Sequence, residues 1–335
     1  MEAVWQGAFE KKSVRAQKSV WFVAFWVKRA KRIFFWLTVW QDVLRTLLRG
    51  FYKRSVLRHF AQISQTAPPT LSLHMNPEEY ERMHELETHY WWFVGRRGIV
   101  RTLLQQTVPL LPSRAPRLVD IGCGTGANLP MLRRSVGEAG SVVGLDFSPL
   151  ALAHAREELA HLPDLGLSQG DAMQLPLRDQ SADCVTMLDV LEHLRDDKCA
   201  LSEVARVLKP GGALILTVPA YQHLWSAHDE ALHHFRRYEK HELRARLREA
   251  DLRVEKLSFA MSLLPPAAYI WRHLVLPRVP RRPRDAQRHS QGAVLPQLPP
   301  LLNAAMIRMI ELEGRVLLKR PLRFGTSLVA LAWKR

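Results

Sequence analysis

One stretch of the chain, residues 118–128 (LVDIGCGTGAN), restricts the fold more than any other. Apolar residues surround a single aspartate, Asp120, and predict a short buried strand. Gly122, Gly124 and Gly126 follow at every second position, and a helix is predicted directly after them. Glycines allow positive φ and the close approach of a ligand, and a helix N-terminus offers free N–H groups. The stretch therefore predicts a strand, a glycine turn and a helix that together hold a nucleotide.

Two kinds of nucleotide fit this loop. Gly122, Gly124 and Ala127 match the loose dinucleotide fingerprint, and Asp146 lies 22 residues after Gly124, where an acid would bind an NAD ribose. Against NAD, the third glycine comes one residue early, and Asp120 lies two residues before the first glycine. An acid there disfavours a pyrophosphate and favours a ligand with a cationic amino group and a sulfonium. The spacing resembles the first motif of the class I S-adenosylmethionine (SAM) methyltransferases, acid-x-Gly-x-Gly-x-Gly.

Strands and helices alternate after this motif, which predicts a parallel sheet with helices on both faces. The fold class is therefore α/β, with a Rossmann-like, doubly wound, seven-stranded sheet. The resemblance implies an antiparallel last strand between strands five and six, an N-terminal helical lid and a C-terminal insertion. After the strand that begins at residue 117 or 118, the further strands are predicted at 141–146, 165–170, 182–189, 213–219, 252–259 and 325–333.

Acidic residues follow the predicted strands, at the edge where ligands bind in such sheets. The resemblance implies that the three glycines and Asp120 line the amino-acid part of SAM. It also implies that Asp146 binds the ribose, that Asp171 binds the adenine amino group, and that the Ala172 N–H contacts the ring. Asp189, after the fourth strand, is predicted to complete the cofactor site.

An aromatic cluster, residues 89–93 (HYWWF), and the arginines that follow it precede the first strand. Core packing explains most such clusters, but this one lies directly before the glycine turn. In the family that the chain resembles, N-terminal helices form a lid over SAM. This implies that Trp92 and Arg96 contact the cofactor.

The fourth strand leads into Glu192 and His193, a pair that resembles the Glu-His box of methyltransferases acting on small molecules and lipid precursors. His193 is predicted to bind substrate; the alternative is a structural pair that fixes the loop. The strand is not followed by the Asn/Asp-Pro-Pro-aromatic box or the Pro-Cys pair of nucleic-acid methylation. Nucleic acid is therefore not the expected partner.

The densest chemistry lies in residues 221–238, here called the acceptor loop, which carry four histidines, two acids and two arginines. The loop resembles the signature Trp-Ser-x-His-Asp-Glu-Ala-x-x-His-x-Arg-Arg-Tyr of a bacterial group of class I methyltransferases associated with glycan or cell-surface biosynthesis. Because it leaves the ligand edge of the sheet, it is predicted to hold the methyl acceptor. The candidate bases are His228, Asp229 and His234; the candidate substrate-binding residues are Tyr221, Trp225, Arg236, Arg237 and Tyr238, together with His193.

Two alternatives apply to this loop. Arg236 and Arg237 either hold an anionic group of the substrate or pair with Asp229 and Glu230 and fix the loop. Asp229 and His233 are four residues apart, but they match no standard zinc spacing, and no metal site is predicted. Three cysteines, Cys123, Cys184 and Cys199, likewise form no metal, redox or disulfide pattern and fit a reducing cytoplasm.

The net charge of +16 is unevenly distributed. Residues 1–60 hold 13 Lys or Arg against 3 Asp or Glu, and residues 265–325 hold 11 against 3, whereas residues 61–264 are slightly acidic. Neither of the long charge-free runs in residues 1–60 approaches the ~20 residues of a membrane span. We expect a cytoplasmic protein whose two basic flanks, 1–60 and 265–325, contact an anionic membrane surface at the inner face. For residues 1–60, a disordered or non-native leader is the alternative. The predicted organisation is a leader and linker (1–75), a helical lid (76–115), the SAM-binding core (116–264), an insertion (265–325) and the last strand (326–335).

These features predict a SAM-dependent methyltransferase that transfers a methyl group to an oxygen of a small-molecule, glycan or lipid-linked acceptor. Two other interpretations are kept. The first is a non-enzymatic, membrane-associated SAM-binding or scaffold protein, and the second is an NAD-dependent oxidoreductase.

Overall fold

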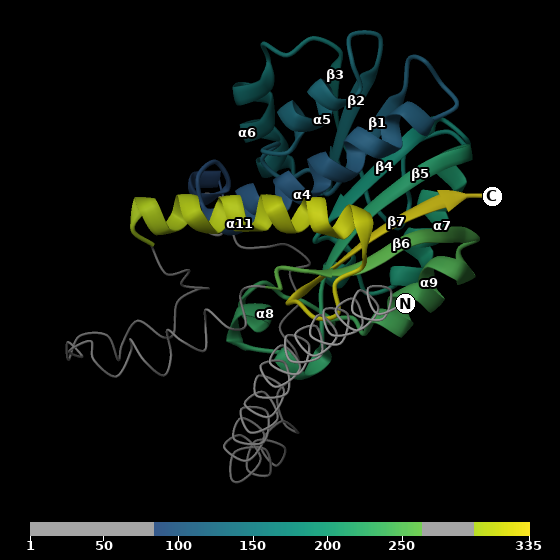
Figure 1. Ribbon diagram of the computed structural model, residues 1–335. Helices are drawn as coiled ribbons and strands as arrows, with labels where there is room; N and C mark the ends of the chain where they lie inside the picture. The colour runs from purple at the N-terminus through teal and green to yellow at the C-terminus, as the bar shows by residue number, and fades with distance from the viewer. Residues whose placement is uncertain (1–83, 263–297) are drawn as a thin grey trace, which may run out of the picture. The chain divides into compact units, whose positions relative to one another are not determined.

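The computed structural model describes residues 84–262 and 298–335 (Figure 1). The chain divides into two units, Met1–Leu71 and Ser72–Arg335, and all described residues belong to the second. The predictions for the leader, for the helix that begins near residue 76 and for the Arg/Pro-rich part of the insertion lie outside the described residues. Within the described ranges, no helix combines the length and the apolarity that a bilayer crossing requires.

A single seven-stranded sheet organises the described unit, in the order β3-β2-β1-β4-β5-β7-β6. The first five strands pair in parallel, and β7 runs antiparallel to both of its neighbours, β5 and β6. The predicted fold class, including the place of the last strand, is confirmed. The strands are β1 (Arg117–Ile121), β2 (Ser141–Asp146), β3 (Leu165–Gln169), β4 (Ala182–Leu188), β5 (Leu208–Pro219), β6 (Leu252–Ala260) and β7 (Ser327–Lys334).

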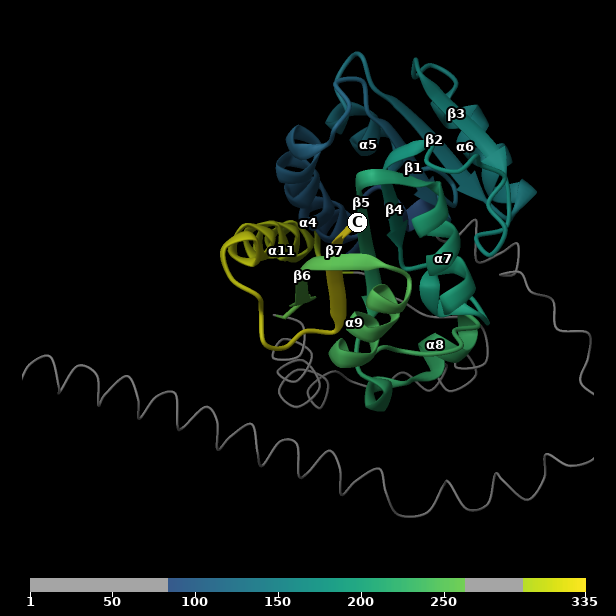
Figure 2. The ribbon, with the colours of Figure 1, turned by 90° about the vertical axis from the view of Figure 1, so that its right-hand side faces the viewer.

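Helices cover both faces of the sheet, because side chains alternate along each buried strand. Leu118 and Ile215 pack in one hydrophobic cluster, and their chain neighbours Val119 and Leu214 pack in another. The first cluster includes residues of α4 (Trp91–Thr107), α5 (Leu129–Ser135), α6 (Pro149–Leu159) and α11 (Pro300–Lys319). The second includes residues of α7 (Asp197–Val207) and α9 (Lys240–Glu249), and Figure 2 shows α4 and α11 apart from α7 and α9.

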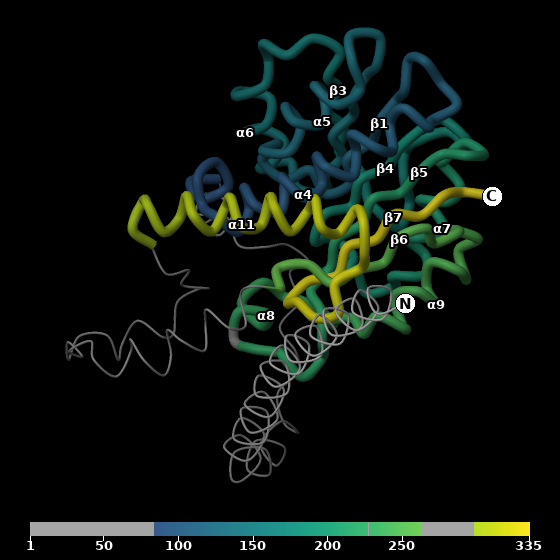
Figure 3. Tube along the Cα trace, viewed as in Figure 1, coloured from purple at the N-terminus to yellow at the C-terminus, as the bar shows by residue number. Residues whose placement is uncertain are grey.

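Helix α11 packs along α4, so the segment before the last strand meets the segment before the first (Figure 1). Glycines let the two helices approach closely. A Cβ added to Gly95 would lie 2.8 Å from the Ile310 side chain, and one added to Gly314 would lie 3.3 Å from the Cα of Ile99. Asn303 joins the helices through its side chain, which accepts a hydrogen bond from the N–H of Trp91 at 2.9 Å. The chain then runs from α11 into β7 (Figure 3).

One predicted boundary is wrong. The fifth strand was predicted at 213–219, but β5 begins at Leu208, so residues 209–212 lie inside it. The pairing with β4 shifts between Ala182 and Cys184, and Gly211 takes a φ of 73°. An irregularity of this kind keeps the strand continuous while it accommodates extra residues.

Candidate active site

The glycine loop, residues 122–126, follows β1 directly, and all three glycines have positive φ. A Cβ on Gly122 would collide with the Val190 side chain, and one on Gly126 would lie 2.6 Å from Leu159. A Cβ on Gly124 would meet no atom within 4 Å. Packing therefore requires the outer two glycines, whereas the middle one borders open space that a ligand can occupy.

Asp120 lies on β1, two residues before this loop, and is 1% exposed. Its Oδ1 accepts a hydrogen bond from the Thr186 hydroxyl at 2.6 Å. Its Oδ2 is buried and has no hydrogen-bond partner among the residues that the structure describes. Burial raises the pKa of Asp120 to about 7. A cationic group placed beside this carboxyl would stabilise its charged form.

Asp146 ends β2 and connects that strand to the glycine loop. Its Oδ2 accepts the Gly124 N–H at 2.8 Å, and its Oδ1 accepts the Ser148 N–H at 2.8 Å. Ser148 is the N-cap of α6 and accepts a hydrogen bond from the N–H of Ala151. Burial raises the pKa of Asp146 even though the backbone donors oppose that shift. A carboxylate offers about four acceptor positions, so beside these backbone donors the group can still accept a ribose hydroxyl.

The residues predicted to contact adenine lie after β3. Asp171 accepts the Met173 N–H at 2.8 Å through Oδ1, and Ala172 is buried in the second hydrophobic cluster. The Asp171 bond is a local turn contact, which leaves its other carboxylate oxygen for a ligand.

Helix α4 reaches the site through Arg96, which forms an ion pair with Asp189 at the end of β4. Asp189 has a φ of 56° and accepts a hydrogen bond from the Thr217 hydroxyl at 2.8 Å. The Arg96 guanidinium lies 4.9 Å from the centre of the Trp92 ring. The two predicted cofactor residues of α4 are thus next to one another and to Asp189.

A further contact escaped sequence reasoning. The Thr125 hydroxyl of the glycine loop donates to Glu87, a buried carboxyl on the short helical segment 84–87. Burial raises the pKa of Glu87. Glu87 belongs to no recognisable sequence motif, because only the fold brings it within hydrogen-bonding distance of Thr125.

Asp229 accepts most of the side-chain hydrogen bonds described within the acceptor loop and is 0% exposed. Arg237 donates to it twice, at 2.7 Å through Nε and at 2.9 Å through Nη2, and the Ser226 N–H and hydroxyl donate at 2.9 and 3.0 Å. His234 Nδ1 lies 2.9 Å from its Oδ1. Burial opposes ionisation, but the bonds from Arg237 and His234 prevail and hold the pKa of Asp229 at about 2. These contacts give Asp229 a positioning role for the loop.

The structure gives internal partners to three of the predicted substrate-binding residues, Arg236, Arg237 and Tyr238. Arg237 binds Asp229, and Arg236 pairs with Asp197 at 3.2 Å rather than with Glu230. Tyr238 is buried, and its hydroxyl donates to Asp197 at 3.1 Å. These contacts agree with the alternative in which the arginines fix the loop.

The remaining residues of the acceptor loop are more accessible. Tyr221 has a φ of 63° and stacks on Phe259, with ring centres 4.9 Å apart, and Trp225 is half-buried. His228 is exposed on the short helix α8 (Ala227–Ala231), where desolvation by the surrounding loop lowers its pKa. His228 therefore offers a neutral imidazole at pH 7.

Glu192, His193 and His234 come together where β4 ends, with ligand atoms within 4.8 Å of one another. The His193 and His234 rings meet edge to face at 4.6 Å. Burial, followed by the neighbouring His234, lowers the pKa of His193 to about 4, and burial raises that of Glu192 well above its usual range. The sequence signalled Glu192 and His193 as a pair, but their proximity to His234 depends on the path of the acceptor loop. By contrast, Asp229 bonds to His234 and not to His233, the residue four positions after it.

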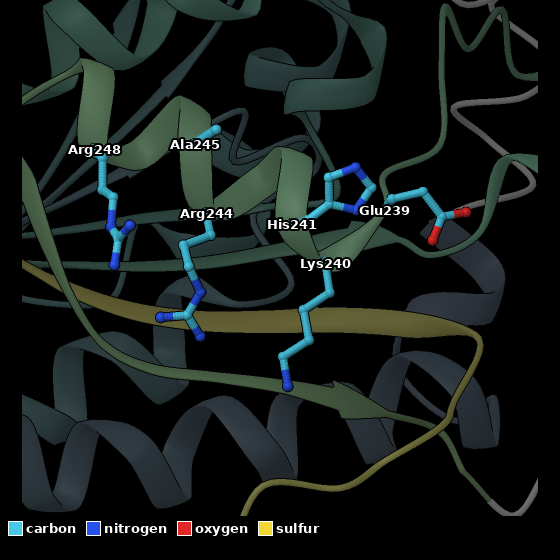
Figure 4. Close-up of a pocket in the computed structure, with 6 residues that line it drawn as sticks. All are labelled: Glu239, Lys240, His241, Arg244, Ala245 and Arg248. Atoms are coloured by element: carbon cyan, nitrogen blue, oxygen red, sulfur yellow. The ribbon is translucent and has the colours of Figure 1, made fainter.

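A pocket with basic lining lies elsewhere, on α9 (Figure 4). Lys240, Arg244 and Arg248 point to the same side of this helix, and the pocket contains none of the predicted site residues. The Lys240 ammonium lies 5.6 Å from the centre of the Phe259 ring. This opening is a cationic surface feature and does not belong to the glycine-loop site.

The sheet order, the glycine loop after β1 and the acid at the end of β2 together define a class I methyltransferase core. A sequence profile of the family described as "Methyltransferase domain" matches residues 119–216. The chain therefore carries a methyltransferase domain, and SAM is the methyl donor that this class of domain implies.

Individual relatives cover part of the chain. A protein of Streptomyces fradiae, described as "Uncharacterized 37.1 kDa protein in transposon TN4556", is 40% identical over 106 residues, which are 32% of this chain and 31% of that protein. The demethylmenaquinone methyltransferase of Staphylococcus aureus (strain Newman) is 36% identical over 155 residues, which are 44% of this chain and 61% of that protein. The chain thus spans less than two thirds of the length of these curated relatives. A SAM-dependent methyltransferase structure from Aquifex aeolicus is 21% identical, covers 56% of this chain and 93% of that one, and has a TM-score of 0.44.

Proposed function

We propose that this protein transfers the methyl group of SAM to an oxygen of a small-molecule, glycan or lipid-linked acceptor. Two observations carry the proposal: the open space at Gly124 and the buried Asp120 carboxyl on the strand before it, which has one oxygen without a partner among the described residues. A ligand with a cationic amino group and a sulfonium fits that combination, and a pyrophosphate does not. Asp146 and Asp171 are assigned to the ribose and the adenine.

The main task of the protein in this reaction is to position the methyl donor and the acceptor. When bound, SAM supplies a methyl group on a sulfonium: an acceptor oxygen forms the new C–O bond as the C–S bond breaks, and the bonding pair stays on the sulfur. Holding donor and acceptor in line is worth about 7–11 kcal/mol. The acceptor hydroxyl must also lose its proton, and a positioned base adds about 10²–10⁴-fold.

We assign the proton transfer to the acceptor loop, with His228 and His234 as the imidazoles concerned. Asp229 supports them by orienting His234 through the 2.9 Å contact with Nδ1. The relatives named demethylmenaquinone methyltransferase support a small-molecule acceptor, and the resemblance of the acceptor loop favours a glycan or lipid-linked one.

Calorimetric titration of the full chain with SAM and with NADH tests the cofactor. We expect SAM to bind at one site and NADH not to bind; NADH binding without SAM binding would replace this function with an oxidoreductase. Turnover of SAM to S-adenosylhomocysteine with a cell extract separates an enzyme from a SAM-binding scaffold, which would bind SAM without turnover.

Substitutions in the acceptor loop test the proton transfer. We expect His228→Ala and His234→Ala to fold and bind SAM, and at least one of them to lose turnover. His233→Ala, an exposed neighbour, is the matched control and should keep full turnover. Full turnover in both test variants would remove the assignment, and joint loss of melting temperature and SAM binding would indicate a structural role.

The basic flanks support a second part of the proposal, that the protein contacts an anionic membrane surface through residues 1–60 and 265–325. Lys240, Arg244 and Arg248 add a cationic surface on α9. Sedimentation with anionic vesicles should exceed that with neutral vesicles and should weaken with salt, because the Debye length is ~8 Å at 0.15 M. Equal sedimentation with both vesicles, or none with either, would defeat this part.

A further inference from the structure

Three side chains with metal-ligand chemistry converge from two segments that are distant in the sequence. Glu192 and His193 belong to the short helix η2 (Leu191–His193) after β4, and His234 belongs to the acceptor loop. The Phe235 N–H donates to the Glu192 carbonyl at 2.8 Å, which fixes the loop to η2 beside these side chains. The ligand atoms of the three lie within 4.8 Å of one another.

His234 is oriented as metal-bound histidines are. Its Nδ1 lies 2.9 Å from Asp229, and Asp229 is itself held by the two Arg237 bonds and by Ser226. A carboxylate on one ring nitrogen fixes the tautomer and leaves Nε2 as the basic atom, which is the usual arrangement behind a metal-ligating histidine.

Glu192 supplies the observation that points to a ligand. It is 1% exposed, and its Oε2 is buried with no hydrogen-bond partner among the described residues. Buried carboxyl oxygens are nearly always partnered, since an unmade bond costs about 1–3 kcal/mol or more. A cation between Glu192 and the two imidazoles would supply the missing partner.

Neighbouring carboxylates are already engaged, which limits the ligand set. Asp189 pairs with Arg96 and accepts the Thr217 hydroxyl, and Asp229 is fully bonded. Glu192 is therefore the carboxylate that remains for a cation at this position.

We propose that Glu192, His193 and His234 bind a divalent transition-metal cation. Two imidazoles and one carboxylate suit Zn²⁺, Fe²⁺, Co²⁺ or Mn²⁺ better than the all-oxygen preference of Mg²⁺ or Ca²⁺. Ligand bonds of about 2.0–2.2 Å place the three donor atoms about 3–4 Å apart, which small side-chain rotations reach from the observed separation. Three protein ligands leave a position open for an oxygen of another molecule.

The role of this cation rests on the proposed function. An acceptor hydroxyl bound at the open position would be more acidic. Its proton would pass to His228, the accessible imidazole of the same loop, because His234 would hold the cation and could not also take the proton. The oxygen pair would then form the bond to the methyl carbon as the C–S bond breaks, and the neutral thioether would leave with the pair of that bond.

The test uses the full chain with any affinity tag removed, stripped with a chelator and dialysed. Titration with Co²⁺, followed by its visible d–d spectrum, and with Zn²⁺ by calorimetry should each give one site per chain in the absence of SAM. We expect His193→Ala, His234→Ala and Glu192→Gln each to weaken binding by on the order of 100-fold, and Asp229→Asn by about 10–100-fold. His233→Ala is the matched control and should bind like the parent.

Several outcomes would overturn the proposal. The first is that the parent protein binds neither Co²⁺ nor Zn²⁺. The second is that the three ligand variants, shown by thermal unfolding to be folded, bind the metal as tightly as the parent. Full turnover of SAM by the stripped protein would overturn the catalytic role. Because the titrations contain no SAM, a failure of SAM binding would contradict the proposed function without affecting the metal-binding result.

Discussion

Arg96 on α4 forms an ion pair with Asp189 at the end of β4, although 93 residues separate them in the sequence. Their side chains are 10% and 14% exposed, so the pair is largely removed from water. Asp189 is also bonded to Thr217 on β5, which extends the connection to a second strand. The position of α4 over the sheet edge is thus coupled to the strand ends that form the site.

Removing one member of this pair should be costly. We expect Arg96→Ala to lower the free energy of unfolding by about 3 kcal/mol, because Asp189 would keep a buried charge without its partner. Arg101→Ala is the control: it breaks a pair with Glu311 in which Arg101 is 52% exposed, and it should cost less than about 1 kcal/mol. Urea unfolding measures both. Similar small losses in the two variants would mean that the Arg96 pair does not hold α4.

Different glycines of the loop serve ligand binding and packing. We expect Gly124→Ala to weaken SAM binding strongly while costing only about 1–2 kcal/mol of stability, because its Cβ enters open space and only φ is strained. Gly126→Ala should cost more stability, since its Cβ would lie 2.6 Å from Leu159. Calorimetry with SAM and urea unfolding measure the two effects. Unchanged SAM affinity in Gly124→Ala would place the ligand elsewhere.

Most of the sheet could be predicted because its signals are local. Strands β1 to β4 are short, and each ends at, or directly before, a glycine or an aspartate. Ser148, directly before a proline, is the N-cap of α6. The start of the fifth strand was predicted too late because lysine, proline and two glycines at 209–212 favour a turn locally, whereas β5 already pairs with β4 from Leu208. Tertiary pairing overrides local preference in such cases.

The site was harder to predict because its partners are remote. Glu87 holds Thr125 across 38 residues, and Arg96 holds Asp189 across 93. Arg237 looked like a substrate anchor because arginine suits anions, and the anion that it meets is Asp229. Sequence spacing identifies the polar and charged residues that can act in a site, and the fold determines which of them form hydrogen bonds and ion pairs with one another.

Asp120 predicts a pH dependence of stability. Its pKa rises from 3.8 to about 7 on burial, so the folded protein binds this proton more tightly than the unfolded chain does. Stability should therefore be greatest below about pH 4 for this group and should fall by up to about 1.4 kcal/mol per pH unit as pH rises toward 7. Asp120→Asn should remove this slope, as urea unfolding between pH 4 and pH 8 would show.

The same carboxyl links SAM binding to pH. A cationic amino group beside Asp120 favours its charged form, so binding below pH 7 should release a proton, and affinity should rise as pH approaches 7. Calorimetry in buffers of different ionisation enthalpy counts that proton. Asp183→Asn, a buried aspartate at the start of β4, is the control and should leave the pH dependence of SAM affinity unchanged. Proton release that persists in Asp120→Asn would assign it to another group.

The last prediction separates two roles for the arginines of the acceptor loop. Arg237 makes two bonds to a fully buried Asp229, whereas Arg236 is 28% exposed and makes a longer contact with Asp197. We expect Arg237→Ala to lower the free energy of unfolding by about 3 kcal/mol and Arg236→Ala by less than about 1 kcal/mol. Arg237→Lys should recover only part of the loss, since an ammonium cannot reproduce the two parallel bonds.

The pH profile of the Arg237 effect gives the sharper test. Asp229 has its pKa lowered to about 2, so its bonds stabilise the fold above the unfolded value of 3.8, and this stabilisation is lost as pH falls toward 2. The difference between the parent and Arg237→Ala should therefore be full at pH 7 and smaller at pH 3. An arginine that held an anionic acceptor group would behave differently: its removal would leave unfolding unchanged at both pH values and raise the KM for the acceptor. Because Asp229 also orients His234, we expect Arg237→Ala to reduce turnover as well, and Arg237→Lys to restore turnover in proportion to the stability that it restores.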